Sequence, residues 1–311
     1  MVIPAPVVPK QDSPVSEVFH YLHAYPLLGS VVRHCSWLLL LCVIFVPGEY
    51  FLAARSRKSS RKSIFGDVGF YFISGFVPHL LLIFPLALAA YAAYRFVPWR
   101  IHAATAGLPI WLSGLAAFVV ADLGFYWGHR WAHKIPFMWR FHALHHAPED
   151  VYFLISARAH PIDNAFIRMC GLVPIYLLGL GAPDSVKGTL TATLIMLLMT
   201  VWGFFIHANI RLRYGPLEWL LATPGFHHWH HNGSEVRDRN FASMLPVWDW
   251  IFGTLHLPKT WPASYGIDEK LPASIASQLL YPLFPPANRA EPPVARVGDI
   301  RVISPSPSSS G

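Results

Sequence analysis

Charged residues are scarce in this sequence. Asp, Glu, Lys and Arg make up only 13% of the 311 residues, whereas 54% are hydrophobic. Soluble globular domains carry about a quarter charged residues, so the composition excludes an ordinary soluble domain and indicates a protein largely surrounded by lipid. The formal net charge is +7, but the basic residues do not gather on a polar domain, and we therefore predict no nucleic-acid partner.

Cysteine is also rare. The chain has three, Cys35, Cys42 and Cys170, and no two of them form a C-x-x-C motif. This excludes a disulfide framework and gives no sign of an iron–sulfur cluster.

Long uncharged runs are what the sequence has instead. Residues 68–94, 103–121 and 188–206 contain no Asp, Glu, Lys or Arg, and each can cross the bilayer core as a helix, which takes about 20 residues. A further apolar stretch covers 35–54. A shorter one, 169–182, either forms half of a helical hairpin with 188–206 or enters the membrane only partly. We predict an all-α integral membrane protein with about four to five membrane helices.

The domain organisation follows from these runs. We expect an N-terminal surface segment over residues 1–30 and one membrane domain over 31–288, with a histidine-rich core at about 110–255. Residues 271–284 are predicted to form a surface helix. The end of the chain, 289–311, is rich in Pro and Ser and is predicted to be disordered.

Membrane orientation is predicted from a basic loop. Five basic residues lie between residues 55 and 62, and such loops are usually cytoplasmic. Counting spans from this loop brings the ends of 103–121 and 188–206 to the same side. We therefore predict a multi-pass protein with a helical cap on the cytoplasmic face, where the histidine clusters described next can meet.

Histidines are crowded into two short stretches. Nine of the 17 histidines lie there: His129, His133, His142, His145 and His146 within 18 residues, and His227, His228, His230 and His231 within five. Such crowding does not help packing, because neutral imidazoles each need a hydrogen-bond partner and protonated ones repel. Histidine is the commonest metal ligand. The clusters predict a metal centre, and their number favours two ions, since a zinc site closes at four ligands.

These histidines form three short motifs, which we call histidine boxes: His129 with His133, then His142 to His146, and then His227 to His231. The spacing within each box favours a helix. His129 and His133 are four residues apart and share one helical face. His142, His145 and His146 also share a face. The third box has its own helix signals, with Thr223 as N-cap, Pro224 as first residue and a stop at Asn232-Gly233. In that helix His227, His230 and His231 share one face, and His228 lies off it.

Other kinds of metalloprotein remain as alternatives. A zinc hydrolase would need a general-base glutamate, as in H-E-x-x-H, and no box contains one. A membrane metal transporter would hold its ligands at mid-bilayer on discontinuous helices, whereas these boxes flank the spans.

The sequence from about Pro109 to about Gly253 resembles the fatty acid hydroxylase / sterol desaturase superfamily of integral-membrane di-iron oxygenases. The resemblance rests on the three histidine boxes and on the segments around them. These segments are Asp122 with Tyr126-Trp127 and His129-Arg130, Trp139-Arg140-Phe141-His142, Arg158-Ala159-His160-Pro161, His207-Ala208-Asn209, Asp238-Arg239-Asn240, Trp248-Asp249 and Phe252-Gly253.

The resemblance implies two iron ions held mainly by histidine. The implied core ligands are His129, His133, His142, His145, His146, His227, His230 and His231. His207 stands where relatives often have a further histidine. His160 is either a ligand or a hydrogen-bond partner of one. Relatives often have H-x-x-x-H around His207, and here the fourth residue on is Arg211, so one ligand is either missing or supplied by His160.

Three polar residues are predicted to lie around the ligands. Asp122 comes two helical turns before His129 and either orients an imidazole, as carboxylates beside metal ligands do, or has a structural role. Asp238 has the same two alternatives. Asn209 belongs to the segment that carries His207.

The resemblance also implies an activity. Such a protein uses O2 and external electrons to hydroxylate or desaturate a lipid, fatty acyl or sterol-like, in lipid metabolism. The sequence shows no electron-transfer domain of its own, so a separate ferredoxin- or cytochrome-type donor with its reductase is expected. Whether the product is an alcohol or an alkene depends on substrate placement and is left open, as is the alternative of a non-oxygenase metalloprotein.

Overall fold

The computed structural model describes residues 24–56, 61–181, 185–233 and 238–284. Over these ranges the chain forms helices and two isolated β-bridges, and no strand. The all-α class is therefore confirmed. The basic residues 57 and 58 and the tail 289–311 lie outside the described residues.

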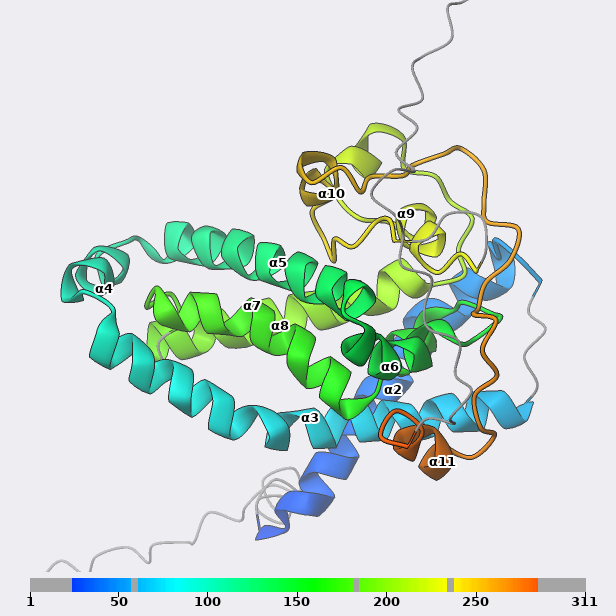
Figure 1. Ribbon diagram of the computed structural model, residues 1–311, viewed down its shortest axis with the longest axis horizontal. Helices are drawn as coiled ribbons and strands as arrows, with labels where there is room; N and C mark the ends of the chain where they lie inside the picture. Colours follow the sequence, from blue (N-terminus) through cyan, green and yellow to red (C-terminus); the bar gives the residue numbers. More distant parts are fainter. Residues whose placement is uncertain (1–23, 57–60, 182–184, 234–237, 285–311) are drawn as a thin grey trace, which may run out of the picture.

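Four helices are long and apolar enough to cross a membrane: α2 (Pro26–Phe51), α3 (Arg61–Phe96), α5 (Ile110–Lys134) and α8 (Val186–His207). They confirm an integral membrane protein and agree with the predicted number of spans. The stretch 169–182 lies partly in α7 (Pro161–Leu177), which has 17 residues and is not among the four. Helix α7 packs between α3 and α5 (Figure 1). That the histidine boxes face the cytoplasm stays a prediction.

Prolines account for two differences from the expected helix boundaries. Helix α2 begins at Pro26, so that residues 26–30, expected in a surface segment, are its first residues; proline suits a first turn because its missing N–H is not needed there. The expected span 103–121 is displaced towards the C-terminus. The chain forms the short helix α4 (Trp99–Ala106), breaks, and starts α5 after Pro109, since proline disfavours helix at the residue before it.

Glycines bring α5 and α7 unusually close together. A Cβ atom on Gly124 would lie 2.1 Å from the carbonyl oxygen of Cys170, and one on Gly128 would lie 2.8 Å from the Cys170 Cβ. Small residues let membrane helices approach closely and gain van der Waals contact. This contact holds α5, which carries the first histidine box, against α7.

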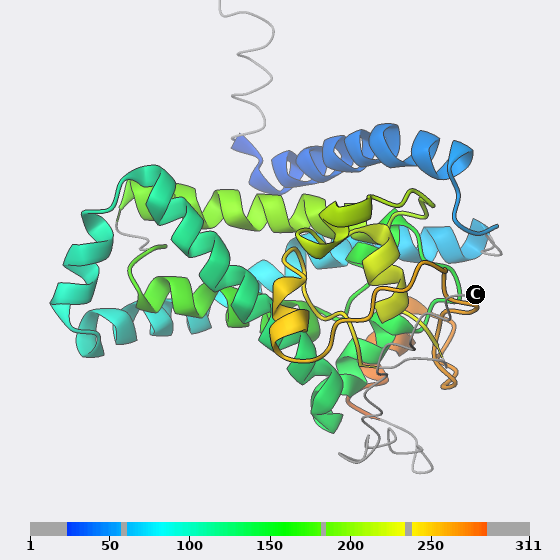
Figure 2. The same ribbon diagram turned by 90° about the horizontal axis from the view of Figure 1, so that it is seen from above.

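The remaining elements form a cap at one end of the helical bundle (Figures 1 and 2). They are α6 (Pro136–His146), η1 (Phe153–Ala157), η2 (Gly215–Trp219), α9 (Pro224–His230), α10 (Val247–Ile251) and α11 (Ile275–Leu280). Helix α11 is shorter than the predicted 271–284. Glu49 of α2 ties the cap to the bundle, because its buried carboxylate accepts hydrogen bonds from the backbone N–H groups of Phe153 and Asn209.

Candidate metal centre

The first two histidine boxes face each other across a sharp bend. Helix α5 continues past its apolar part to Lys134, and α6 begins at Pro136, as the sequence predicts. The bend brings His146 towards His133 of the preceding helix. Their Nε2 atoms are 3.1 Å apart, and the His142 Nε2 atom is also 3.1 Å from that of His146.

The third box lies on α9 and reaches both of the others. Thr223 caps this helix, its hydroxyl accepting a hydrogen bond from the Phe226 N–H, and Pro224 is the first residue; both predictions are confirmed. The His230 Nε2 atom lies 3.0 Å from that of His146. The His227 Nε2 atom lies 3.0 Å from that of His207, the last residue of α8.

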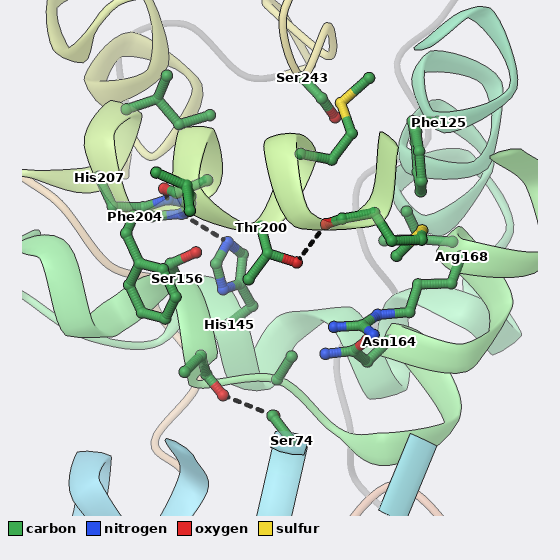
Figure 3. A pocket seen from close by; sticks show the side chains of 18 of the residues that line it. Ser74, Phe125, His145, Ser156, Asn164, Arg168, Thr200, Phe204, His207 and Ser243 are labelled. Carbon is green, nitrogen blue, oxygen red and sulfur yellow. Dashed lines mark hydrogen bonds between the residues drawn. The ribbon is translucent and has the colours of Figure 1, made fainter. Parts of the chain in front are cut away.

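Nine histidines thus form two compact groups. The first group is His129, His133, His142, His146 and His230, and the second group is His145, His207, His227 and His231. The ligand atoms within each group lie within 4.8 Å of one another, and eight of the nine residues are buried, His133 being half-buried. Figure 3 shows His145 and His207 facing each other at one side of a cavity. The structure therefore brings nine of the ten predicted ligands together and divides them between two sites.

Hydrogen bonds to backbone carbonyls determine which ring nitrogen carries the proton. A carbonyl oxygen can only accept, so each Nδ1 atom that contacts one must be the donor. Four rings are held in this way: His129 by Phe241 (2.8 Å), His145 by Arg158 (3.2 Å), His207 by Gly203 (2.6 Å) and His230 by Arg239 (2.8 Å). The Nε2 atom of each neutral ring then has a free lone pair that points into its group.

The contact between His145 and His207 shows why the groups fit metal ions. Both rings donate from Nδ1 to a carbonyl, so neither Nε2 atom has a proton, yet the two Nε2 atoms are only 3.1 Å apart. Two lone pairs at this distance repel and cannot form a hydrogen bond. A cation between them would turn the repulsion into coordination, and imidazole suits iron, zinc and copper.

Burial keeps these rings in the form that binds metal. The pKa values of His145, His146 and His230 lie well below the ordinary histidine value, mainly because the rings are buried and also because other imidazoles lie close by. The same holds for the pKa of His227 and His231. Metal binding needs the neutral imidazole, so these rings do not have to lose a proton at neutral pH before they bind.

Asp163 is a site residue that the sequence did not reveal. Its carboxylate lies 3.0 Å from the His142 Nδ1 atom, and both side chains are only 2% exposed. In the sequence it is an acidic residue in the first turn of α7, which is common at any helix N-terminus. Only the packing of α7 beside α6 gives it a role at the first group.

Replacing Asp163 by asparagine should weaken metal binding at the first group. The carboxylate accepts the His142 Nδ1 proton and orients that ring, and loss of such a partner lowers metal affinity by about 10- to 100-fold. Titration of metal-free protein with iron measures the effect. The exposed Asp268→Asn removes a carboxylate elsewhere and should bind iron like the wild type; an unchanged affinity in Asp163→Asn would contradict the assignment.

Asp238, Asp122 and Asn209 have different surroundings. Asp238 has its Oδ1 atom 3.3 Å from the His133 Nδ1 atom, and its other oxygen pairs with Lys134. Asp122 accepts hydrogen bonds from the backbone of residues 244 and 245 and from the indole of residue 248, so the contacts of its carboxylate anchor the cap and do not orient an imidazole. The Asn209 side chain bonds to the backbone of residues 54 and 55.

His160 and His228 lie outside both groups. The His160 Nδ1 atom accepts a hydrogen bond from the Ile162 N–H, and its Nε2 atom donates to the Leu279 carbonyl, so neither nitrogen has a lone pair free for a metal. His228 contacts the Tyr265 hydroxyl and the Ala208 carbonyl. Of the two alternatives for His160, a ligand or a hydrogen-bonding residue, these contacts favour the second.

The variant His160→Asn should therefore keep its metal. An asparagine side chain can still cap the first turn of α7, and only the bond to residue 279 is lost, at a cost of about 1 kcal/mol in the free energy of unfolding. Elemental analysis of the purified variant should give the wild-type metal content. A loss of one metal ion per chain would return His160 to the ligand set.

A cavity of about 440 Å³ adjoins the two groups. His129, His142, His145, His207 and His227 line one part of it. Elsewhere its wall is mainly apolar and includes Phe125, Met196, Met199 and Phe204, from α5 and α8 (Figure 3). Candidate metal sites thus border a space that suits an apolar chain.

Comparison with known proteins points to the same part of the chain. The family model described as "Fatty acid hydroxylase" matches residues 114–254, the segment that contains all nine grouped histidines. The predicted family resemblance is confirmed. No solved structure matches the chain.

Three similar proteins differ in the activities that their names describe. Over 203 residues the chain is 33% identical to an ornithine lipid hydroxylase from Rhizobium tropici, covering 64% of this chain and 58% of that protein. It is 35% identical over 140 residues to the alkylglycerol monooxygenase of Homo sapiens (45% of this chain, 29% of that one). It is 28% identical over 198 residues to a very-long-chain aldehyde decarbonylase of Oryza sativa subsp. indica (62% and 70%). The chain thus spans little more than half of the first relative and less than a third of the second.

Proposed function

We propose that this protein is a di-iron membrane oxygenase that uses O2 and external electrons to hydroxylate the apolar chain of a lipid. The observation that carries the proposal is the pair of histidine groups, with unprotonated Nε2 atoms converging, beside an apolar cavity. Similar proteins named as an ornithine lipid hydroxylase and an alkylglycerol monooxygenase support a lipid substrate and hydroxylation.

Different residues would bind the metal ions, orient the imidazole rings and hold the substrate. The first group would hold one iron and the second group the other, with Asp163 and the backbone carbonyls of residues 158, 203, 239 and 241 fixing the rings. When bound, two irons supply the capacity to activate O2. The apolar wall around Phe125 and Phe204 would hold the substrate chain and exclude water, which matters because water interferes with reactive intermediates.

The rest of the predicted assembly belongs to the same proposal. Electrons would come from a separate ferredoxin- or cytochrome-type donor with its reductase. The cap would face the cytoplasm, where a soluble electron donor of this kind could reach it. The functional unit would be the membrane domain 31–288, with its histidine core at about 110–255.

The experiment is a lipid screen on the purified full-length protein in detergent, loaded with iron and supplied with O2, a ferredoxin and its reductase. Mass spectrometry should find a lipid that has gained one oxygen atom, with label from ¹⁸O2. His102→Ala, on α4 and outside both groups, should behave as wild type. Hydrolysis products that form without O2 would contradict the proposal and favour the zinc hydrolase.

A further inference from the structure

Arg168 is a charged residue in the wall of the cavity. It lies near the middle of α7, a helix that packs between two candidate membrane spans, and its side chain points into the cavity (Figure 3). A guanidinium stays protonated in proteins. Within residues 24–284, as far as the structure describes them, the Arg168 side chain takes part in no ion pair or hydrogen bond. A charge at this depth is costly and usually functional.

The surroundings of Arg168 offer it little compensation. The cavity wall contributed by Phe125, Met196 and Met199 is apolar. Among the described residues that line the cavity, Asp163 is the carboxylate. Its Oδ2 atom is engaged with the His142 ring, and its Oδ1 atom has no hydrogen-bond partner and forms no ion pair with Arg168. Metal ions at the two histidine groups would add further positive charge to the same space. A cavity with this balance of charge favours an anion as part of its occupant.

Asn164 adds a second donor at the same place. It precedes Arg168 by four residues, so that both side chains lie on one face of α7, and both line the cavity. The planar fork of an arginine matches a carboxylate or a phosphate and can bind either through two parallel hydrogen bonds. The amide N–H of Asn164 supplies a third.

We propose that Arg168, with Asn164, binds the anionic group, a carboxylate or phosphate, of a single-chain lipid whose apolar chain runs along the cavity to the two histidine groups. The cavity volume of 440 Å³ is in the range of pockets that enclose one small molecule, which favours one chain over a whole two-chain lipid. The statement that this lipid is the substrate rests on the proposed function. The statement that the lipid binds in this cavity is independent of it.

Equilibrium binding tests the assignment. Radiolabelled palmitate, hexadecyl phosphate and hexadecanol share one chain length and differ in the charge of the terminal group. The wild-type protein in detergent should bind the two anionic lipids at least about tenfold more tightly than the alcohol. In Arg168→Gln the three affinities should become similar, and Arg168→Lys, which keeps the charge without the fork, should show an intermediate preference.

The controls separate a local effect from a general one. Arg100→Gln removes an exposed arginine of α4 and should keep the wild-type preference. Gel filtration and metal content check that each variant is folded. If Arg168→Gln does not fold, Arg168→Lys and Asn164→Ala still report on the preference. A wild type without preference, or Arg168→Gln with the full preference, would overturn the proposal.

Two further outcomes have defined meanings. Acetate and inorganic phosphate should not compete with palmitate at millimolar concentration. Competition would mean that Arg168 binds a small free anion, and it would overturn the proposal of a lipid ligand. Binding needs no O2 and no electrons, so an Arg168-dependent preference in a protein without turnover would keep this inference and reject the proposed oxygenase. Turnover of anionic lipids that is as fast in Arg168→Gln as in the wild type would do the reverse: it would keep the oxygenase and reject the role of Arg168.

Discussion

Replacing His146 by alanine should remove metal from the first group and abolish lipid oxidation. The His146 Nε2 atom lies 3.0–3.1 Å from the Nε2 atoms of His133, His142 and His230, so this ring stands at the centre of its group. Its loss leaves a buried gap and removes one of five ligands. Elemental analysis should show about two irons per chain in the wild type and about one or fewer in the variant, since a vacated imidazole position weakens the site.

A matched variant in the second group makes this prediction sharper. His207→Ala removes a ring whose Nε2 atom contacts those of His145 and His227. Iron should be lost from the second group, while the first keeps its five ligands. Iron spectroscopy should therefore find different remaining sites in the two variants. Two irons per chain in both variants would contradict the division into two groups, and identical remaining spectra would mean that both groups form one site.

Replacing Gly124 by alanine should have the largest effect on stability. The new Cβ atom would lie 2.1 Å from a backbone oxygen of α7, and 2.8 Å from the carbonyl carbon of the same residue, so the two helices must separate. Overpacking of this kind costs about 3 kcal/mol in the free energy of unfolding. Because His129 follows on the same helix, the displacement should also lower the iron content.

Gly114→Ala is the matched control for this variant. It makes the same substitution in the same helix, but beyond the adjacent backbone of α5 itself no atom of the described residues lies within 4 Å of the new Cβ. In a helix interior alanine is more favourable than glycine by up to about 1 kcal/mol in the free energy of unfolding. This variant should therefore be as stable as the wild type or more stable. Thermal unfolding in detergent compares the two. Equal stabilities would show that α5 and α7 do not pack as closely as described.

Local sequence signals predicted the helices that carry the histidines. Spacing of three and four residues places His142, His145 and His146 on one face because helix geometry is the same in any context. The cap at Thr223-Pro224 is local for the same reason, since it needs only a side-chain oxygen and a fixed φ within one turn. The uncharged runs identified membrane helices because the bilayer demands a minimum apolar length.

Boundaries and partners were harder to predict. The expected span 103–121 included the helix break before Pro109, because the absence of charged residues does not indicate where a proline ends a helix. The roles of His160, a possible ligand, and of Asp163, for which no role was predicted, were missed for a different reason. The sequence shows a histidine in a familiar segment and an ordinary acidic residue in a first helical turn, and only the neighbours of each side chain distinguish a ligand from a residue that supports one.

By itself the sequence determined that the chain enters the membrane and carries three histidine boxes on helices, because these properties depend on residues close together along the chain. Tertiary structure decided how nine imidazoles divide into two groups and which nitrogen of each ring stays free. The carbonyl that holds the His129 ring belongs to Phe241, far away along the chain, whereas the one that holds the His207 ring belongs to Gly203, one turn earlier in the same helix. A proton's position on a ring depends on what that ring touches, and for His129 the partner lies 112 residues away along the chain, where no local pattern can indicate it.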